Sequence, residues 1–381
     1  MIFSKNFLSP KSRLIIRATC IFWLIAKAIS YKLWFSDREF PLVPPFDFLQ
    51  ASVNFHYIVY GISLVCLILL LISPEKKSFQ IAVVIVEICA CLFDQNRWQP
   101  WEYQYILTII IFLINRKNEK NIIPVFLFML AATYFYSGLG KLNPVFIQSI
   151  WHNLFLTKLF GISYDTAHQP YIHYAGYLFG LIEMILAIGL LYRKTQKKAI
   201  RLIILMHLII LALFGPLGLN YDHIIWPWNL LMISYFVILL WNIQRGETLY
   251  KSNPLKTGWN QLILVLFGIM PFFSLFGMWD YFLSSSLFSS RPTDMYICVP
   301  ASVNTTLNKY FDNAQAPCDS NSYLINTRSW AFDELMVPTY PQKRVYKKIK
   351  EDIQKKYPEL HATYYIYTYE NGRKKVKEEL K

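Results

Sequence analysis

Long apolar runs, separated by short polar segments, occupy most of the first 283 residues. Runs of about 16–22 residues are long enough, or nearly so, to cross a hydrocarbon core of about 30 Å as helices. We therefore expect about nine membrane-spanning helices, of which the third and fourth are short. The expected spans are residues 13–34, 54–73, 79–94, 103–115, 121–140, 171–192, 199–218, 225–242 and 260–283.

The pattern changes beyond the last span. Turn residues cluster there, charges of both signs appear, and apolar runs become short. Residues 294–300 and 362–375 predict strands, the second with a hairpin-like turn at Asn371-Gly372, and residues 341–357 predict an exposed helix. The fold prediction is an all-α polytopic membrane bundle in residues 1–283, followed by a small α+β extramembrane domain in residues 284–381.

Composition agrees with a membrane protein, because 55% of the residues are hydrophobic and only 16% are charged. The net charge of +14 is typical of nucleic-acid partners, but the basic residues are unevenly distributed among the loops. One alternating set of loops holds sixteen Lys and Arg, and the opposite set holds five. The positive-inside rule then places the N-terminus in the cytoplasm and the C-terminal domain outside. We expect membrane lipids, and no nucleic acid, as partners.

The cysteines divide between the two regions. Cys298 and Cys318 are the only cysteines of the C-terminal domain, and an external compartment is oxidising, so they predict a disulfide. The remaining cysteines lie in the expected spans, and the Cys89-x-Cys91 spacing places the two thiols on different helix faces. No metal site is predicted, and no phosphate-binding glycine loop or zinc-protease motif is present.

Four ionisable residues lie well inside the expected spans, where charge is costly and marks candidate functional sites. They are Lys27, Glu87, Glu183 and His207. A structural alternative is that Lys27 pairs with Glu87 or Glu183 and only fixes helix packing.

Polar residues also gather at the external ends of the helices. We predict that they converge on one pocket, although interfacial tryptophans commonly serve only as membrane anchors. Residues 141–170 in addition predict a half-buried amphipathic helix at the lipid boundary. The candidate ligand contacts are Asp94, Asn96, Arg97, Trp98, Trp101, Asn143 and Trp226, with His223 as a candidate catalytic group.

Lys141 is the most specific candidate. Gly138 and Gly140 precede it and allow close packing against a neighbouring helix, which would partly desolvate the lysine. Desolvation disfavours the ammonium form and produces a usable base. The alternative is a lysine that extends its charge to the membrane surface.

The segment YFYSGLGKLNPVFIQSIW, residues 134–151, resembles the vitamin K-dependent γ-glutamyl carboxylases and the wider HTTM (horizontally transferred transmembrane) family. Further segments agree in order over residues 13–242. They are REFPLVPPFDFL after the first span, FDQNRW, GLIEMILAIGLLY with Glu183 at an acidic position, and Met206-His207 followed by Trp226-Pro227.

This resemblance implies that Lys141 is the base that deprotonates a vitamin K-like hydroquinone at a site facing outward from the cytoplasm. It also implies an integral protein of a bacterial cell membrane. Trp101 stands where the family has a catalytic-site histidine, so His223 or another group would have to substitute. About a hundred residues follow the bundle, fewer than the carboxylases use to dock a protein, so we do not expect peptide carboxylation.

Three functions remain open from the sequence. The first is a carboxylase-like membrane enzyme that uses Lys141 on a quinone or lipid-phase substrate. The second is a transporter with a polar path through Lys27, Glu87, Glu183 and His207. The third is a non-catalytic scaffold whose external domain binds a protein partner.

Overall fold

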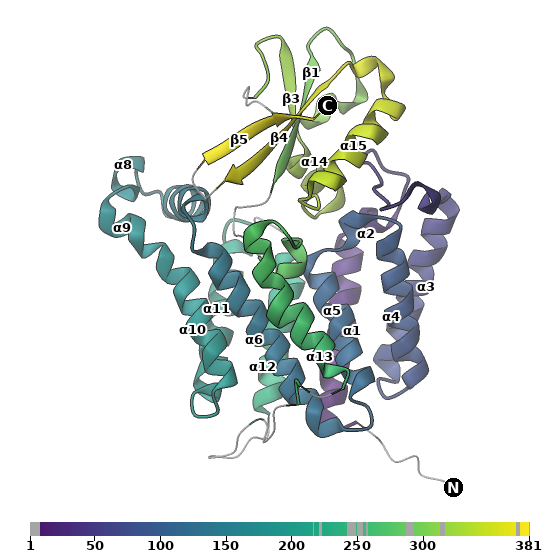
Figure 1. The fold of residues 1–381 in the computed structure, drawn as a ribbon, viewed down its shortest axis with the longest axis vertical. Helices are drawn as coiled ribbons and strands as arrows, with labels where there is room; N and C mark the ends of the chain where they lie inside the picture. Colours follow the sequence, from purple (N-terminus) through teal and green to yellow (C-terminus); the bar gives the residue numbers. More distant parts are fainter. Residues whose placement is uncertain are drawn as a thin grey trace.

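A bundle of long helices forms one end of the molecule, and a small sheet with two helices forms the other (Figure 1). The computed structural model describes residues 8–215, 217–220, 223–241, 249, 254–256, 258–286, 293–312, 317–370 and 374–380. Helix α1 begins at the end of the bundle opposite the sheet, and the C-terminus lies beside the sheet (Figure 1).

Long helices running side by side make up the bundle (Figure 1). They are α1 (Pro10–Ile29), α3 (Val53–Ile72), α4 (Lys77–Leu92), α5 (Pro100–Ile114), α6 (Ile122–Lys141), α10 (Tyr177–Leu191), α11 (Gln196–Phe214), α12 (Ile225–Leu240) and the continuous segment α13 (Asn260–Ile263), η5 (Leu264–Ile269) and η6 (Met270–Phe276). Short elements connect them: α2 (Tyr31–Trp34), η1 (Asp47–Leu49), η2 (Gln95–Arg97), η3 (Glu119–Asn121), α7 (Pro144–Phe146), the π-helix η4 (Ile147–Leu159), α8 (Tyr164–Ala167), α9 (Pro170–Ala175) and η7 (Phe282–Ser284).

Local sequence sets several helix starts. Ser9 caps α1 by accepting from the Ser12 amide, and Ser52 caps α3 in the same way from Phe55. Proline occupies the first position of α1 and of α5, where no backbone N–H is needed.

Three helices of the described chain are long and apolar enough to cross a membrane by themselves: Val53–Ile72, Glu119–Lys141 and Pro170–Leu191. The expectation of nine such spans is therefore not supported. Helices α5 and α12 and the segment Asn260–Phe276 are apolar but shorter. Helices α1 and α11 are long, but Lys and Arg residues reduce their hydropathy.

Helix α6 is the central helix of the bundle. Of its most apolar 18-residue window 72% is buried, compared with 22% for Val53–Ile72 and 28% for Pro170–Leu191. Its most extensive partner is α10. The outer faces of α3 and α10 expose large apolar side chains such as Ile62, Val65, Ile182 and Ile185, which is typical of surfaces that contact lipid.

The C-terminal domain contains an antiparallel sheet of order β2-β3-β1-β4-β5. Its elements are β1 (Asp294–Pro300), η8 (Thr306–Tyr310), β2 (Phe311–Asp312), β3 (Ser322–Asn326), α14 (Thr327–Leu335), α15 (Lys343–Lys356), η9 (Pro358–Leu360), β4 (Thr363–Glu370) and β5 (Lys374–Glu379). Strands β1 and β4 and helix α15 confirm the sequence predictions, whereas β2, β3, β5 and α14 were not predicted. The predicted turn at Asn371-Gly372 lies outside the described residues.

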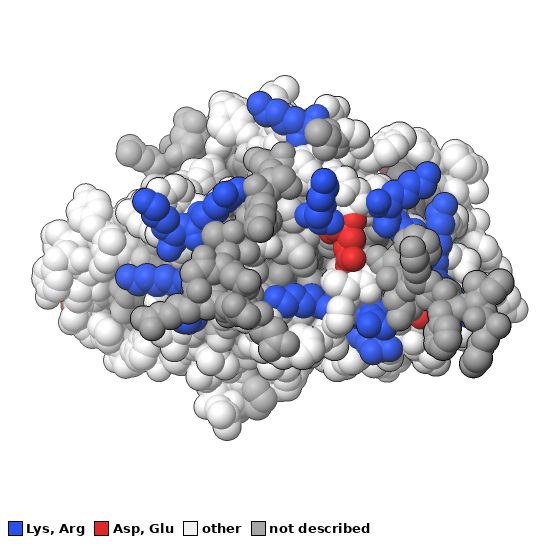
Figure 2. Space-filling model, turned by 90° about the horizontal axis from the view of Figure 1, so that it is seen from below, with Lys and Arg blue, Asp and Glu red and all other residues white. Residues whose placement is uncertain are grey.

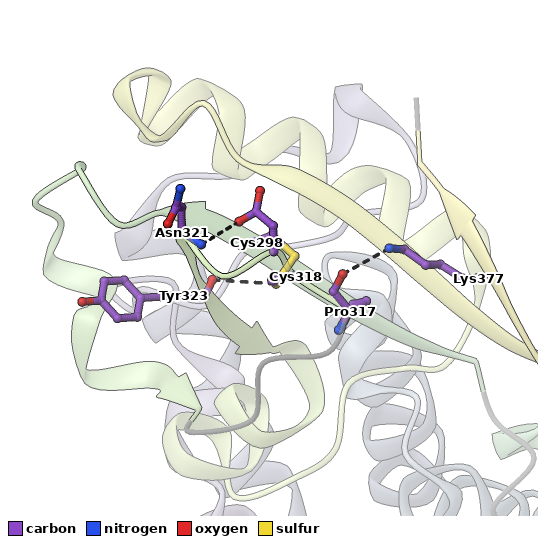
Figure 3. The surroundings of a disulfide bond; sticks show 7 residues. Cys298, Pro317, Cys318, Asn321, Tyr323 and Lys377 are labelled. Atoms are coloured by element: carbon purple, nitrogen blue, oxygen red, sulfur yellow. Dashed lines mark hydrogen bonds between the residues drawn. A yellow bond between two sulfur atoms is a disulfide. The ribbon is translucent and has the colours of Figure 1, made fainter.

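A disulfide joins Cys298 to Cys318, as predicted (Figure 3). It connects the central strand β1 to the loop that precedes β3. On the other side of this loop, the Lys377 ammonium group donates to the Pro317 carbonyl at 3.1 Å. Both contacts hold the loop against the sheet.

The C-terminal domain is attached to the bundle by specific hydrogen bonds. The amide of Tyr340 donates to the side-chain oxygen of Asn96 at 3.0 Å. The carboxylate of Glu334 accepts from the amides of Glu39 at 2.7 Å and Phe40 at 2.8 Å. These bonds fix the position of the domain over the ends of the helices.

Candidate functional site

Lys141 is the last residue of α6 and makes two short contacts with its side chain. Its ammonium group donates to the Ser137 hydroxyl, one turn earlier, at 2.7 Å. It also forms an ion pair with Glu183 of α10 at 2.7 Å, and the two side chains are 10% and 12% exposed. The lysine is thus largely removed from solvent, as expected from its neighbouring glycines.

The glycines allow α6 and α10 to touch. A Cβ atom at Gly138 would lie 2.5 Å from the Gly180 carbonyl oxygen, and one at Gly180 would lie 2.6 Å from the Gly138 carbonyl oxygen. Any larger residue at either position would separate the two backbones. This contact brings Glu183, one turn after Gly180, within reach of Lys141.

His207 lies at the centre of a buried hydrogen-bonded chain. Its Nδ1 atom lies 2.5 Å from the Asn229 side-chain oxygen, and its Nε2 atom is hydrogen-bonded to the Tyr134 hydroxyl. The side-chain NH2 group of Asn229 donates to the Ile225 carbonyl at 2.7 Å. The other terminal atom of this side chain, which faces His207, is therefore its oxygen. The histidine therefore carries its proton on Nδ1, and Tyr134 donates to Nε2.

Both polar groups face a cavity of about 380 Å³ between α6, α10, α11 and α12, with η4 along one side. Its walls are mostly aliphatic and aromatic, from residues such as Ile150, Leu186 and Phe214. The polar side chains of the lining are few. They are Thr133, Tyr134, Ser137, Lys141, Glu183, His207, Trp228 and Asn229.

The cavity lies close to the outer surface of the bundle. Ile182 of α10 and Leu205 of α11 line it, yet each is 51% exposed on the outside of the molecule. The cavity is therefore half open rather than enclosed, and these two residues lie at its boundary with the surroundings of the bundle.

Three other predicted residues lie outside this cavity. Asn143 is buried and caps α7, because its side chain accepts from the Phe146 amide at 3.0 Å and donates to the Gly140 carbonyl at 2.6 Å. His223 is exposed, and its ring lies 5.3 Å from that of Trp226. Neither His223 nor Trp226 lines the cavity.

The side chains of Asp94 and Arg97 bind other residues of the bundle and hold its elements together. Asp94 is ion-paired with Arg38. Arg97 donates to the carbonyls of Ala90 at 2.8 Å and Trp34 at 2.9 Å, which lie near the ends of α4 and α2. Burial lowers the pKa of Arg97 to about 10, but the guanidinium remains charged at neutral pH.

Asn96, Trp98 and Trp101 likewise do not line the cavity. Asn96 accepts from the Tyr340 amide of the C-terminal domain. Trp101 is 4% exposed and packs edge-on against Trp34 at a centroid distance of 6.5 Å. Of the external segments that were predicted to converge, two contribute to the cavity, through Lys141 and Asn229, whereas the loop at residues 94–101 does not line it.

Three cavity residues lie in segments that the sequence singled out, but they were not among the candidate site residues. Tyr134 and Asn229 complete the histidine chain, and Ser137 contacts Lys141. A usable signal existed for Ser137, since it lies one helical turn before Lys141 and thus on the same face. Comparison of the chain with protein-family models, with curated proteins and with solved structures finds no match.

Proposed function

We propose that this protein is a membrane enzyme that binds a hydroquinone, or a similar lipid-phase phenol, in the cavity and uses Lys141 as a base. The observation that carries the proposal is the Lys141–Glu183 pair in an otherwise apolar cavity of about 380 Å³. Sites for small apolar ligands combine apolar walls with a few placed polar groups. The resemblance to the γ-glutamyl carboxylases and the HTTM family assigns the same lysine as the base.

Lys141 must be a neutral amine before it can accept a proton. The carboxylate of Glu183, at 2.7 Å, is positioned to take a proton from the ammonium group. A bound hydroquinone would supply an acidic phenolic hydroxyl; Lys141 accepts its proton and, as ammonium, balances the negative charge left behind.

The chain of Tyr134, His207 and Asn229 provides a second polar contact in the same cavity. Tyr134 donates its hydroxyl proton to His207, so its oxygen lone pairs remain available to accept from a ligand. A planar molecule with an oxygen at each end would satisfy both polar groups.

The exposed, apolar boundary of the cavity at Ile182 and Leu205 suits a ligand that arrives from the lipid. An apolar ring with a hydrocarbon tail is soluble there and not in water. We infer that such a ligand enters between α10 and α11.

This reading requires that the shorter helices also cross the membrane, as the sequence predicts, with the N-terminus in the cytoplasm. Support comes from the face of the bundle opposite the sheet, where Lys and Arg outnumber Asp and Glu (Figure 2). The loops before α4, α6 and α11 supply basic residues to this face. Such an excess is typical of a cytoplasmic face.

A transport path is less well supported, because Lys27 and Glu87 do not line the cavity that contains Glu183 and His207. No contact specifically favours a scaffold function. The enzyme proposal is therefore the one to test first.

The test measures binding and ionisation of a short-chain naphthohydroquinone by the detergent-purified protein under nitrogen. We expect the wild type to bind it and to show, at neutral pH, the longer-wavelength absorbance of the ionised phenol. The double variant Lys141→Met/Glu183→Gln removes both charges, so it leaves no buried unpaired charge. It should fold and bind, but should lose the ionised absorbance.

Lys158→Met is the matched control, because Lys158 is exposed on η4 and lies outside the cavity. This variant should behave like the wild type. Absence of binding by the wild type, or equal ionisation by the wild type and the double variant, would overturn the proposal.

A further inference from the structure

A second cluster of ionisable residues lies inside the bundle and outside the cavity. It joins Lys27 of α1, Glu87 of α4 and Glu102 of α5, and all three residues are 0% exposed. Lys27 and Glu87 form an ion pair at 2.8 Å, which confirms one of the pairings predicted from the sequence. None of the three residues lines the cavity.

Each carboxyl group has one neutral donor. The Ser63 hydroxyl donates to Glu87 Oε1 at 2.6 Å, and the Trp23 indole N–H donates to Glu102 Oε2 at 2.6 Å. The Lys27 ammonium group lies 3.0 Å from the centroid of the Trp34 ring. The two carboxyl groups lie within hydrogen-bonding reach of each other.

The cluster therefore contains one cation and two carboxyl groups. Of the two nearby arginines, Arg38 is ion-paired with Asp94, and Arg97 donates to backbone carbonyls and to His56, so neither forms an ion pair with Glu87 or Glu102. Two adjacent carboxylates in a water-excluded site cannot both ionise without a large cost.

Unpartnered polar atoms lie in the same region. Within the described part of the chain, Glu102 Oε1, the Trp101 indole N–H and the Tyr105 hydroxyl have no hydrogen-bond partner. Trp101 and Tyr105 are in contact, with ring centroids 5.8 Å apart. Buried polar atoms almost always find a partner, so a proton on Glu102 and ordered water are the simplest completion of the site.

We propose that Glu102 binds a proton and donates it as a hydrogen bond to Glu87, so that the Lys27–Glu87–Glu102 cluster is a proton-binding site inside the bundle. The bound proton balances the cluster, which then holds one ammonium, one carboxylate and one neutral carboxylic acid. The inference is independent of the cavity and of any hydroquinone.

Infrared spectroscopy tests it directly, because a protonated carboxylic acid has a C=O stretching band that a carboxylate lacks. The wild type at neutral pH should show this band, with a shift in deuterated water and on labelling glutamate with ¹³C. The measurement is made in the Lys141→Met/Glu183→Gln background, where Glu183 cannot contribute to the band, and there Glu102→Gln should abolish it. Glu334→Gln is the matched control and should keep the band, because Glu334 is buried outside the cluster and accepts from two backbone amides and the Trp330 indole.

Thermal unfolding provides a second readout. Glu102→Gln should melt close to the wild type, because the amide has the shape of the neutral acid and still donates to Glu87. Glu87→Gln should melt much lower, because it removes the partner of Lys27. The proposal is overturned by a wild type without the band, by a band that survives in Glu102→Gln, or by equal destabilisation in both variants. It is also overturned if melting depends on sodium and the band is absent, because a bound cation would then balance the site.

Discussion

Two residues without side chains determine how closely α6 approaches α10. Gly138 and Gly180 place each backbone against the carbonyl oxygen of the other. Because the Lys141–Glu183 pair lies one turn beyond this contact, the geometry of the candidate site depends on it.

Gly138→Ala should therefore destabilise the protein, although alanine is the better helix former. The added Cβ would lie 2.5 Å from the Gly180 oxygen and must push the helices apart, at a cost of about 1–3 kcal/mol. Gly61→Ala, in α3, is the matched control because nothing lies within 4 Å of its added Cβ, and it should stabilise by about 1 kcal/mol. Thermal unfolding in detergent measures both. Equal effects of the two substitutions would show that the close contact is unimportant.

At the residue scale, the sequence predicted the position of Lys141 but not all its neighbours. The glycines before it indicated close packing, whereas its contact with Ser137 was not predicted, although helical spacing places the two residues on one face. Arg97 was misleading for a physical reason: its position in a polar loop resembles a ligand site, but helix-end carbonyls need donors too. Which acceptor an arginine meets depends on tertiary packing, which the local pattern does not contain.

At the scale of the elements, the π-helix η4 forms one side of the cavity, and its residue His152 is buried. The sequence predicted a half-buried amphipathic helix in this region, and His152 is on its buried side. Its ring lies 4.2 Å from that of His168 and 5.1 Å from that of His173, which belong to the segment formed by α8 and α9. Gln148 also contacts His152, at 3.4 Å.

This histidine makes the packing of η4 sensitive to acid. Burial, and then the neighbouring His168 and His173, lower the pKa of His152 from 6.5 to about 4. Between these two values the unfolded segment binds a proton that the folded one excludes, so stability is complete above pH 6.5 and is lost as the pH falls toward 4. The protection of residues 147–175 against hydrogen exchange, relative to the intrinsic exchange rate at each pH, should therefore fall from pH 7 to pH 5.

His152→Gln cannot titrate and should reduce this loss of protection. His361→Gln, at an exposed position in the C-terminal domain, is the control and should leave it unchanged. If both variants retain the full pH effect, His152 is not its source.

Strong local patterns predicted elements well, and weak ones did not. The apolar runs and the strand patterns at residues 294–300 and 362–370 correspond to helices and strands of the structure. The short strand β3 was missed because its residues gain their pairing from β1, where Ile325 lies opposite Ile297. Strand β2 has only two residues, too few for an alternating pattern.

At the scale of the whole molecule, the loop at residues 94–99 connects the bundle to the C-terminal domain by hydrogen bonds. Asn96 binds the Tyr340 amide, and Gln95 accepts from Arg344 at 3.0 Å. Arg344 in turn is ion-paired with Asp280, at the end of the bundle. These partners are separated by up to 249 residues in the chain, so no local pattern indicates them.

Asn96→Ala should loosen the C-terminal domain without unfolding the bundle. The substitution leaves the N–H of Tyr340, a residue that is 2% exposed, without its acceptor, at a cost of about 1–3 kcal/mol. We expect faster hydrogen exchange in residues 336–342 and unchanged exchange in α6 and α10. Asn118→Ala, at an exposed position at the other end of the bundle, should change neither. If Asn96→Ala instead reduces ligand binding and leaves the exchange at residues 336–342 unaltered, the loop belongs to a binding site, as the sequence first indicated. The two results separate a docking role from a ligand-binding role, because only docking requires the bond to Tyr340.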